Sequence, residues 1–228
     1  MKKIKLVIKD IVILLSTFLL MLLLTYLFYP IVKKNIKFEP AIETLIYLLI
    51  SLYLFIIYRK EIINYFKDFR LNYKKYISKN FEFFVICILA MMILNIILVE
   101  IIGQMPTNEE LNKSSIKNNL FFSFLQVCIF APFYEEILFR LNFKNLFKNK
   151  IIFSIFTGLI FGSMHLISAK SLIEIPFILS YSIAGFALGY VFYDTNNIFT
   201  SMFFHFFNNF LSLILTIIGE YLWKGLYV

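Results

Sequence analysis

Long uncharged apolar runs limit what this chain can fold into more than any other feature of its sequence. The first run, Ile11 to Val32, contains no Asp, Glu, Lys or Arg. A signal-peptide core has only about 7 to 15 apolar residues, whereas about 20 residues cross a bilayer as a helix. Hydrophobic residues make up 61% of the chain, compared with roughly half of a soluble domain. We therefore expect an integral membrane protein.

Further apolar runs predict an all-α bundle of about seven transmembrane helices. Between the third and fourth runs, Met105 to Asn118 is polar and contains Pro106, so we expect a loop there. We expect residues 1–228 to form a single membrane domain. The runs after the first are Ala41–Tyr58, Phe83–Gly103, Leu120–Phe143, Lys150–Ser168, Leu172–Tyr193 and Ile198–Leu222.

The segment Arg59 to Asn80 combines apolar periodicity with many basic residues. This pattern is typical of an amphipathic helix on the cytoplasmic membrane surface, and the alternative is a simple charged loop. The periodic residues are Ile62, Phe66, Phe69, Tyr73 and Ile77.

Small residues recur at three- or four-residue steps in two of the expected helices. Such steps let two helix backbones approach closely. The pattern predicts helix packing and indicates no activity by itself. The small residues are Ser154, Gly158 and Gly162 in the fifth helix and Ser182, Gly185 and Gly189 in the sixth.

The distribution of charge predicts the orientation of the helices. A cytoplasmic N-terminus places 14 of the 22 Lys and Arg residues on the cytoplasmic side and seven on the other, with Arg140 inside a helix. The positive-inside rule favours this arrangement. Because the net charge of +8 is spread between the apolar runs, we expect no nucleic-acid partner. Cys87 and Cys128 both lie in apolar runs, which indicates neither a disulfide nor a metal site.

Two adjacent carboxylates, Glu135 and Glu136, lie in the fourth apolar run. Ionisable groups at membrane depth are costly and mark functional or tightly paired residues. Residues four apart share a helix face, so Glu136 is expected to pair with Arg140. Glu135 then lies on a neighbouring face of the helix and is the candidate catalytic residue. The alternative is a buried ion-pair cluster that only fixes helix packing.

Both histidines of the chain lie in expected membrane helices, each with a partner four residues away. Phe161 precedes His165, and His205 precedes Asn209. At a rise of about 1.5 Å per residue, Glu135, His165 and His205 lie roughly 14, 22 and 16 Å from the cytoplasmic ends of their helices. We therefore expect the three side chains to converge in the middle of the membrane. We also expect the active-site mouth to open to the cytoplasm, because the shortest hydrated path to these depths starts there.

The ordered motifs EExxxR, FxxxH and HxxxN on successive membrane helices resemble those of the CAAX protease and bacteriocin-processing family (CPBP, or Abi) of intramembrane endopeptidases. The resemblance covers about Leu120 to Phe210, so the catalytic helices are expected within residues 120–210. The first three helices are matched by hydropathy alone. The motif residues are Glu135, Glu136 and Arg140, then Phe161 and His165, then His205 and Asn209.

The resemblance implies hydrolysis of a peptide bond in a membrane-associated or lipidated peptide. Glu135 would act as the general base on water, and His165 would orient that water. His205 and Asn209 would stabilise the oxyanion. The remaining motif residues would be structural, with Glu136 and Arg140 as the ion pair and Phe161 as a packing residue.

Zinc is the alternative way to activate water, because two histidines and a carboxylate can hold it with one open position. The ligands would be Glu135, His165 and His205. However, the HExxH pattern is absent, and Asn is a poor zinc ligand. We therefore favour a reaction without a metal cofactor.

The expected partners are membrane lipid and a peptide or lipidated protein substrate. The abundance of Lys, Asn, Ile and Phe favours a bacterial cell membrane, where the resemblance suggests bacteriocin maturation or immunity besides CAAX-type processing. The competing classes are a non-catalytic immunity or scaffold protein and a small transporter. The absence of an inverted repeat argues against the transporter.

Overall fold

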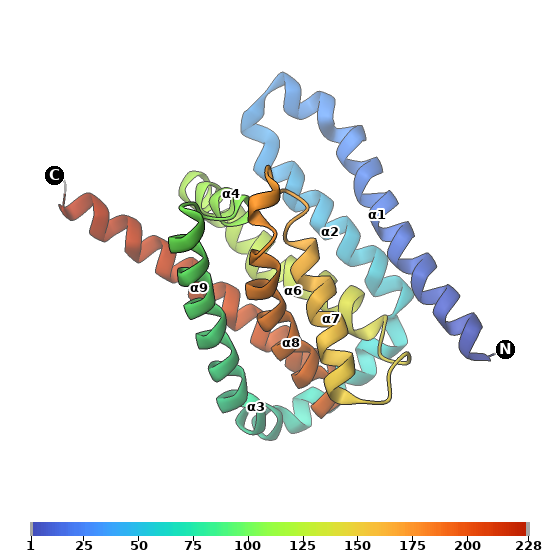
Figure 1. The fold of residues 1–228 in the computed structure, drawn as a ribbon. Coiled ribbons are helices and arrows are strands. Elements are labelled where there is room, and N and C mark those ends of the chain that lie inside the picture. The colour runs from blue at the N-terminus through green and yellow to red at the C-terminus, as the bar shows by residue number, and fades with distance from the viewer. Residues whose placement is uncertain (1, 227–228) are drawn as a thin grey trace.

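The computed structural model describes residues 2–226, in which every regular element is helical (Figure 1). The expected all-α membrane bundle is confirmed. The α-helices are α1 (Lys2–Lys34), α2 (Glu39–Ile57), α3 (Arg59–Ile102), α4 (Thr107–Asn118), α5 (Leu120–Ser123), α6 (Ala131–Glu136), α7 (Lys150–Met164), α8 (Phe177–Thr195) and α9 (Ile198–Leu226). Short 3₁₀ turns are η1 (Ile36–Phe38) and η4 (Leu172–Glu174), and π-helical segments are η2 (Phe124–Phe130) and η3 (Ile137–Leu141).

Six helical segments of the described residues are long and apolar enough to cross a membrane. The expected fifth helix, Lys150–Ser168, is shorter, because α7 ends at Met164 after 15 residues. The helix ends here because the next two N–H groups, of Leu166 and Ile167, donate to carbonyls only three residues earlier. The sixth helix, expected from Leu172, starts as α8 only at Phe177. Pro176 directly precedes α8 as its N-cap, and a proline is tolerated at a helix start, where its missing N–H is not needed.

The third transmembrane helix and the basic amphipathic segment form one continuous helix, α3, of 44 residues. Figure 1 shows α3 turning at the bottom of the view, where its first part runs across one end of the bundle and its second part ascends the side. The predicted helix is therefore present, and it continues without interruption into the third apolar run. No Gly or Pro interrupts the junction, and the Asn80 side chain donates to the Tyr76 carbonyl within the same helix.

The segment expected as a loop, Met105–Asn118, contains the helix α4. Glu109 and Glu110 lie in its first turn and Lys117 in its last, which is the charge order that a helix dipole favours. The first backbone N–H, that of Thr107, donates to the Glu174 carboxylate at 2.8 Å. A distant carboxylate therefore caps a helix that its own sequence leaves without a side-chain cap.

The predicted contact between the small residues of α7 and α8 is confirmed. A Cβ atom on Gly158 would lie 2.8 Å from the Phe186 backbone nitrogen, and one on Gly185 would lie 2.8 Å from the Phe161 Cβ. Both distances are too short for any residue larger than glycine. The backbones of α7 and α8 are thus in contact, and this contact fixes the position of Phe161.

Candidate active site

The paired carboxylates lie on α6, a short α-helix between the π-helical segments η2 and η3. In η2 the Ala131 N–H donates to the Gln126 carbonyl, five residues earlier. The next donor in that register would be residue 132, which is Pro132 and has no N–H. The Val127 carbonyl thus lacks its π-helical donor. π-helical turns occur frequently at functional sites.

Asn209 of α9 compensates for this missing donor. Its side-chain Nδ2 donates to the Val127 carbonyl at 2.8 Å, and its Oδ1 accepts from Asn208 at 3.2 Å. The HxxxN motif is therefore attached to the fourth transmembrane segment at the position where Pro132 interrupts its hydrogen bonding. One of the two amide hydrogens of Asn209 remains for another acceptor.

Glu136 is fully buried and contacts two motif residues at once. Its Oε2 lies 3.3 Å from Arg140 Nε, in the expected ion pair. Its Oε1 lies 3.0 Å from His205 Nδ1. A carboxylate only accepts, so His205 donates from Nδ1 and its Nε2 faces the remaining space. The contact with His205 gives Glu136 an orienting role that residue spacing within one helix could not reveal.

Arg140 connects the ion pair to α7 and α8. Its Nη2 donates to the Gly185 carbonyl at 3.2 Å, and its guanidinium carbon lies 4.9 Å from the centre of the Phe161 ring. The Phe161 ring also lies 4.3 Å from the His165 ring and 5.5 Å from the His205 ring, centre to centre. Phe161 is the packing residue that the motif predicts, and it touches both histidines.

Glu135 points away from the ion pair, as the rotation between adjacent helix residues predicts. Tyr134 donates its hydroxyl to Glu135 Oε1 at 3.2 Å. The other oxygen, Oε2, is buried, has no hydrogen-bond partner and lies 3.9 Å from His205 Nε2. Glu135 therefore presents one fixed and one free carboxylate oxygen to the site.

His165 caps α7 and is held in one orientation. Its Nδ1 lies 2.9 Å from the Phe161 carbonyl, which can only accept, so Nδ1 is the donor and Nε2 is free. Its ring stacks on Tyr181 with centres 4.8 Å apart. Both histidines thus direct Nε2 away from their anchoring contacts.

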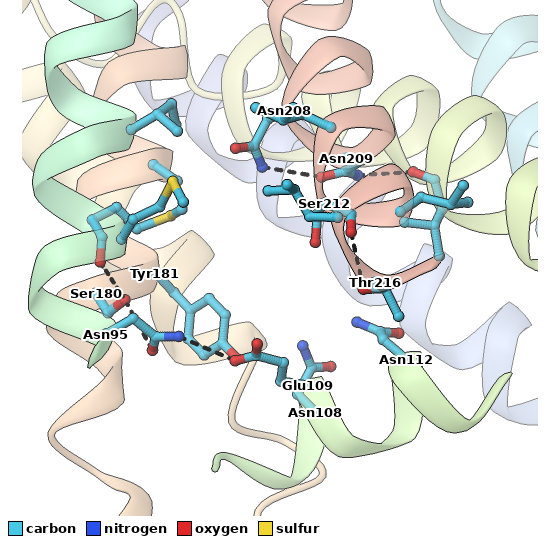
Figure 2. A pocket seen from close by; sticks show the side chains of 18 of the residues that line it. Asn95, Asn108, Glu109, Asn112, Ser180, Tyr181, Asn208, Asn209, Ser212 and Thr216 are labelled. Atoms are coloured by element: carbon cyan, nitrogen blue, oxygen red, sulfur yellow. Dashed lines mark hydrogen bonds between the residues drawn. The ribbon is translucent and has the colours of Figure 1, made fainter. Parts of the chain in front are cut away.

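A cavity of about 680 Å³ lies beside these side chains, between α3, α4, α8 and α9. His165, His205, Asn209 and Phe161 line it, whereas Glu135 is absent from its lining. Figure 2 shows amide and hydroxyl groups around it, from Asn95 on α3, Asn112 on α4 and Thr216 on α9, among others. Four of the predicted site residues therefore line one cavity, and Glu135 lies next to it, in contact range of His205.

The lining of this cavity bears on the expected direction of access. Asn108, Glu109 and Asn112 of α4 line it, and α4 follows the end of α3 that lies opposite the N-terminus in an alternating arrangement. With a cytoplasmic N-terminus, an opening beside α4 would face the outside and not the cytoplasm. The earlier expectation rested on helix depth alone, and depth does not reveal on which side the helices separate.

The candidate zinc ligands do not form a ligand set in this geometry. Among the described residues, no three His, Cys, Asp or Glu side chains are grouped so that they could hold a metal ion. Glu135, His165 and His205 therefore do not fit the zinc alternative as they stand.

Sequence motifs overlooked two aromatic contacts of the site. Tyr134, next to the carboxylates, fixes Glu135, and Tyr181 stacks on His165. Tyr134 directly precedes the pair and was a visible candidate. Tyr181 lies 16 residues after His165 with no patterned spacing, so only the fold identifies it.

Fold and site together define a polytopic helical membrane protein with a buried carboxylate and histidine centre beside one cavity. Residues 117–211 match the family model of the Rce1-like proteins, described as type II CAAX prenyl endopeptidase Rce1-like. The match includes every candidate site residue from Glu135 to Asn209 and confirms the resemblance that the motifs indicate. It indicates an intramembrane endopeptidase. No curated protein and no solved structure shows significant similarity to the chain.

Proposed function

We propose that this protein is an intramembrane endopeptidase that cleaves a peptide bond in a lipidated or membrane-associated peptide. The observation that carries the proposal is Glu135 Oε2, a buried carboxylate oxygen without a hydrogen-bond partner, 3.9 Å from His205 Nε2. Burying a carboxylate oxygen without a hydrogen-bond partner costs folding free energy. A general base nevertheless needs such an oxygen, because it must be free to accept a proton.

Glu135 takes a proton from a water molecule in the proposed reaction, and the water oxygen bonds to the carbonyl carbon. His165 Nε2 accepts the second hydrogen of that water and so orients it. The carbonyl π electrons move onto the oxygen, which becomes an oxyanion. When the C–N bond then breaks, the protonated Glu135 gives its proton to the leaving nitrogen.

The oxyanion is stabilised by His205 and Asn209. When His205 carries both ring protons, its Nδ1–H donates to Glu136 and its Nε2–H is free for the oxyanion. Asn209 supplies the amide hydrogen that Val127 does not use. Glu136 and Arg140 keep His205 in place and make no contact with the substrate.

The cavity walls support an amphipathic substrate. The α3 wall is mostly apolar, with Ile88, Met91 and Met92, whereas the α9 wall carries Asn208, Ser212 and Thr216. A lipid or apolar side chain fits the α3 wall, and peptide amides fit the α9 wall. Prenylated proteins of the CAAX type and bacteriocin precursors are both amphipathic in this way. We propose that the enzyme acts in a bacterial cell membrane, with its own N-terminus in the cytoplasm.

We propose a reaction without a metal cofactor, because the candidate ligands are not grouped as a metal site. The expected result is that purified, reconstituted protein keeps its peptidase activity after prolonged chelation. Loss of activity that added zinc restores would contradict this part of the proposal.

The substitution Glu135→Gln tests the function directly. The amide keeps the volume and the hydrogen bond from Tyr134 but cannot take a proton, so we expect cleavage of a farnesylated reporter peptide to be lost. The control, Glu110→Gln, changes an exposed carboxylate of α4 that does not line the cavity and should retain cleavage. Unchanged activity of Glu135→Gln with native melting behaviour would favour another base. Inactivity of the wild type on all lipidated peptides would favour the non-catalytic immunity or scaffold class.

A further inference from the structure

We propose that water reaches Glu135 by a second route, separate from the substrate cavity, through a small cavity between α1 and α2 and past the hydroxyls of Tyr47 and Tyr134. The inference rests on the proposed function, because only a hydrolase needs to renew water at Glu135. In this proposal Tyr47 and Tyr134, which belong to none of the sequence motifs, act as positioning residues for the water.

The need for such a route follows from the position of Glu135. Each cleavage consumes one water molecule, yet Glu135 does not line the large cavity. A lipidated peptide in that cavity covers the two histidines and its apolar part excludes water from the α3 wall. Renewal of water from the substrate side would then have to wait for product release.

The second cavity has a volume of about 180 Å³ and lies between the C-terminal part of α1 and the N-terminal part of α2. Helices α1 and α2 are connected there by a polar segment with Lys33, Lys34, Asn35 and Lys37, so this end lies at the membrane–water boundary. The volume is enough for several water molecules. Half of its lining residues are apolar, and the other half have side-chain oxygen atoms, namely Thr25, Tyr29, Glu39, Glu43 and Tyr47.

Three of these polar residues form one line along α2. Glu39, Glu43 and Tyr47 are four residues apart, so they share one face of the helix. From Glu39 to Tyr47 the line extends about 12 Å along the helix axis, from the boundary towards the middle of the membrane. Carboxylates on a transmembrane helix face are costly unless they meet water or a partner.

The line continues from Tyr47 to the catalytic base. The rings of Tyr47 and Tyr134 are 5.6 Å apart between centres, and Tyr134 donates to Glu135 Oε1. Glu43, Tyr47, Tyr134 and Glu135 thus follow one another from the second cavity towards the active site, with the ring contact of the two tyrosines in the middle.

A plug in the second cavity tests the route. Thr25→Trp places an indole inside this cavity, whereas Leu27→Trp places the same indole on the outer surface of α1, where Leu27 is 57% exposed and does not line the cavity. We expect Thr25→Trp to lower kcat for a farnesylated reporter peptide several-fold with KM unchanged. Leu27→Trp should match the wild type in both constants.

A second variant, Tyr47→Phe, removes one hydroxyl with little change of volume. A water route predicts a lower kcat, an unchanged KM and an unchanged melting temperature, because substrate binding uses the other cavity. A residue that only packs would leave kcat unchanged. Wild-type kcat in both Thr25→Trp and Tyr47→Phe would overturn the proposal.

Radiolytic hydroxyl labelling, which oxidises side chains next to water, gives a readout that does not depend on peptidase activity. We expect oxidation of Tyr47 and Tyr134 in the wild type and in Leu27→Trp, and protection of both in a folded Thr25→Trp. Equal labelling in all three proteins would overturn the route even if Glu135→Gln had already established the proposed function. Conversely, a failed peptidase assay with the expected labelling would reject the function and leave the route as a structural fact.

Discussion

At the scale of single residues, two neighbouring glutamates have different surroundings because adjacent helix positions face different directions. Glu136 meets Arg140 and His205, so both of its oxygens face positively charged or donor groups. Glu135 accepts one hydrogen bond, from the Tyr134 hydroxyl, and its Oε2 accepts none and lies 3.9 Å from His205 Nε2. The proposed division between a base and a support follows from these contacts.

The buried pair of Glu136 and Arg140 leads to a prediction about stability. Glu136→Ala and Arg140→Ala should each destabilise the folded protein by about 3 to 5 kcal/mol, because either change leaves an uncompensated charge in a low dielectric. The double substitution should cost less than the sum of the two. Unfolding in detergent would measure the three free energies. Strictly additive losses would show that the two residues do not interact.

The sequence predicts which residues form the site better than it predicts their contacts. Spacing within one helix identifies the pair Glu136 and Arg140, since both ends belong to the same helix. Contacts between helices, such as His205 with Glu136, depend on helix rotation. The apolar periodicity does not reveal the π-helical hydrogen bonding before Pro132. The hydrogen bond from Asn209 to the Val127 carbonyl is therefore visible only in the structure.

At the scale of elements, α4 is attached to the bundle by a carboxylate from another loop. Glu174 is 1% exposed and accepts from the Thr107 N–H, the Thr107 hydroxyl and the Lys170 N–H. Burial alone would raise the pKa of Glu174, but these hydrogen bonds hold its pKa below the usual 4.5. Because α4 lines the substrate cavity, Glu174 also fixes one wall of that cavity.

This cap should make stability depend on pH in a defined direction. The folded pKa lies below the unfolded value, so the contribution of Glu174 is complete above about pH 4.5 and is lost as the pH falls through the folded pKa. Glu174→Gln should cost about 1 to 2 kcal/mol at neutral pH, as the loss of a helix cap does. Melting curves of both proteins at pH 7 and in acid provide the measurement. A difference that persists undiminished in acid would contradict the assignment.

The helices that were misjudged from the sequence share a physical cause. The fifth helix was expected to reach Ser168, but α7 ends at Met164, after which the N–H groups of Leu166 and Ile167 donate to carbonyls three residues earlier. The segment around α4 was expected to be a loop because its residues are polar, but its cap comes from Glu174, far away in sequence. Apolar runs predict helices that cross the membrane, whereas helix ends depend on individual hydrogen bonds.

At the scale of the whole molecule, the bundle has two cavities with different chemistry. The large one borders the histidines and has a mostly apolar α3 wall, and the lining of the small one includes Glu39, Glu43 and Tyr47. Residues of α4 line the large cavity and the facing ends of α1 and α2 line the small one, and Figure 1 shows α4 and the connection of α1 with α2 at the same end of the bundle. The N-terminus and the segment 142–149 lie at the other end in an alternating arrangement, so orientation decides from which side substrate and water arrive.

Impermeant thiol reagents can determine this orientation. Single cysteines at Ser115 on α4 and at Asn145 after η3 would be placed at two exposed sites in a background without Cys87 and Cys128. The excess of Lys and Arg around the N-terminus and along the first part of α3 predicts a cytoplasmic N-terminus. We therefore expect Asn145→Cys to react only from the cytoplasmic side and Ser115→Cys only from outside, which would place the cavity mouth on the outer face. The reverse labelling would turn the mouth to the cytoplasm and make this chain an exception to the positive-inside rule. In that orientation the substrate would approach from the cytoplasm, as the depth of the motif residues first suggested.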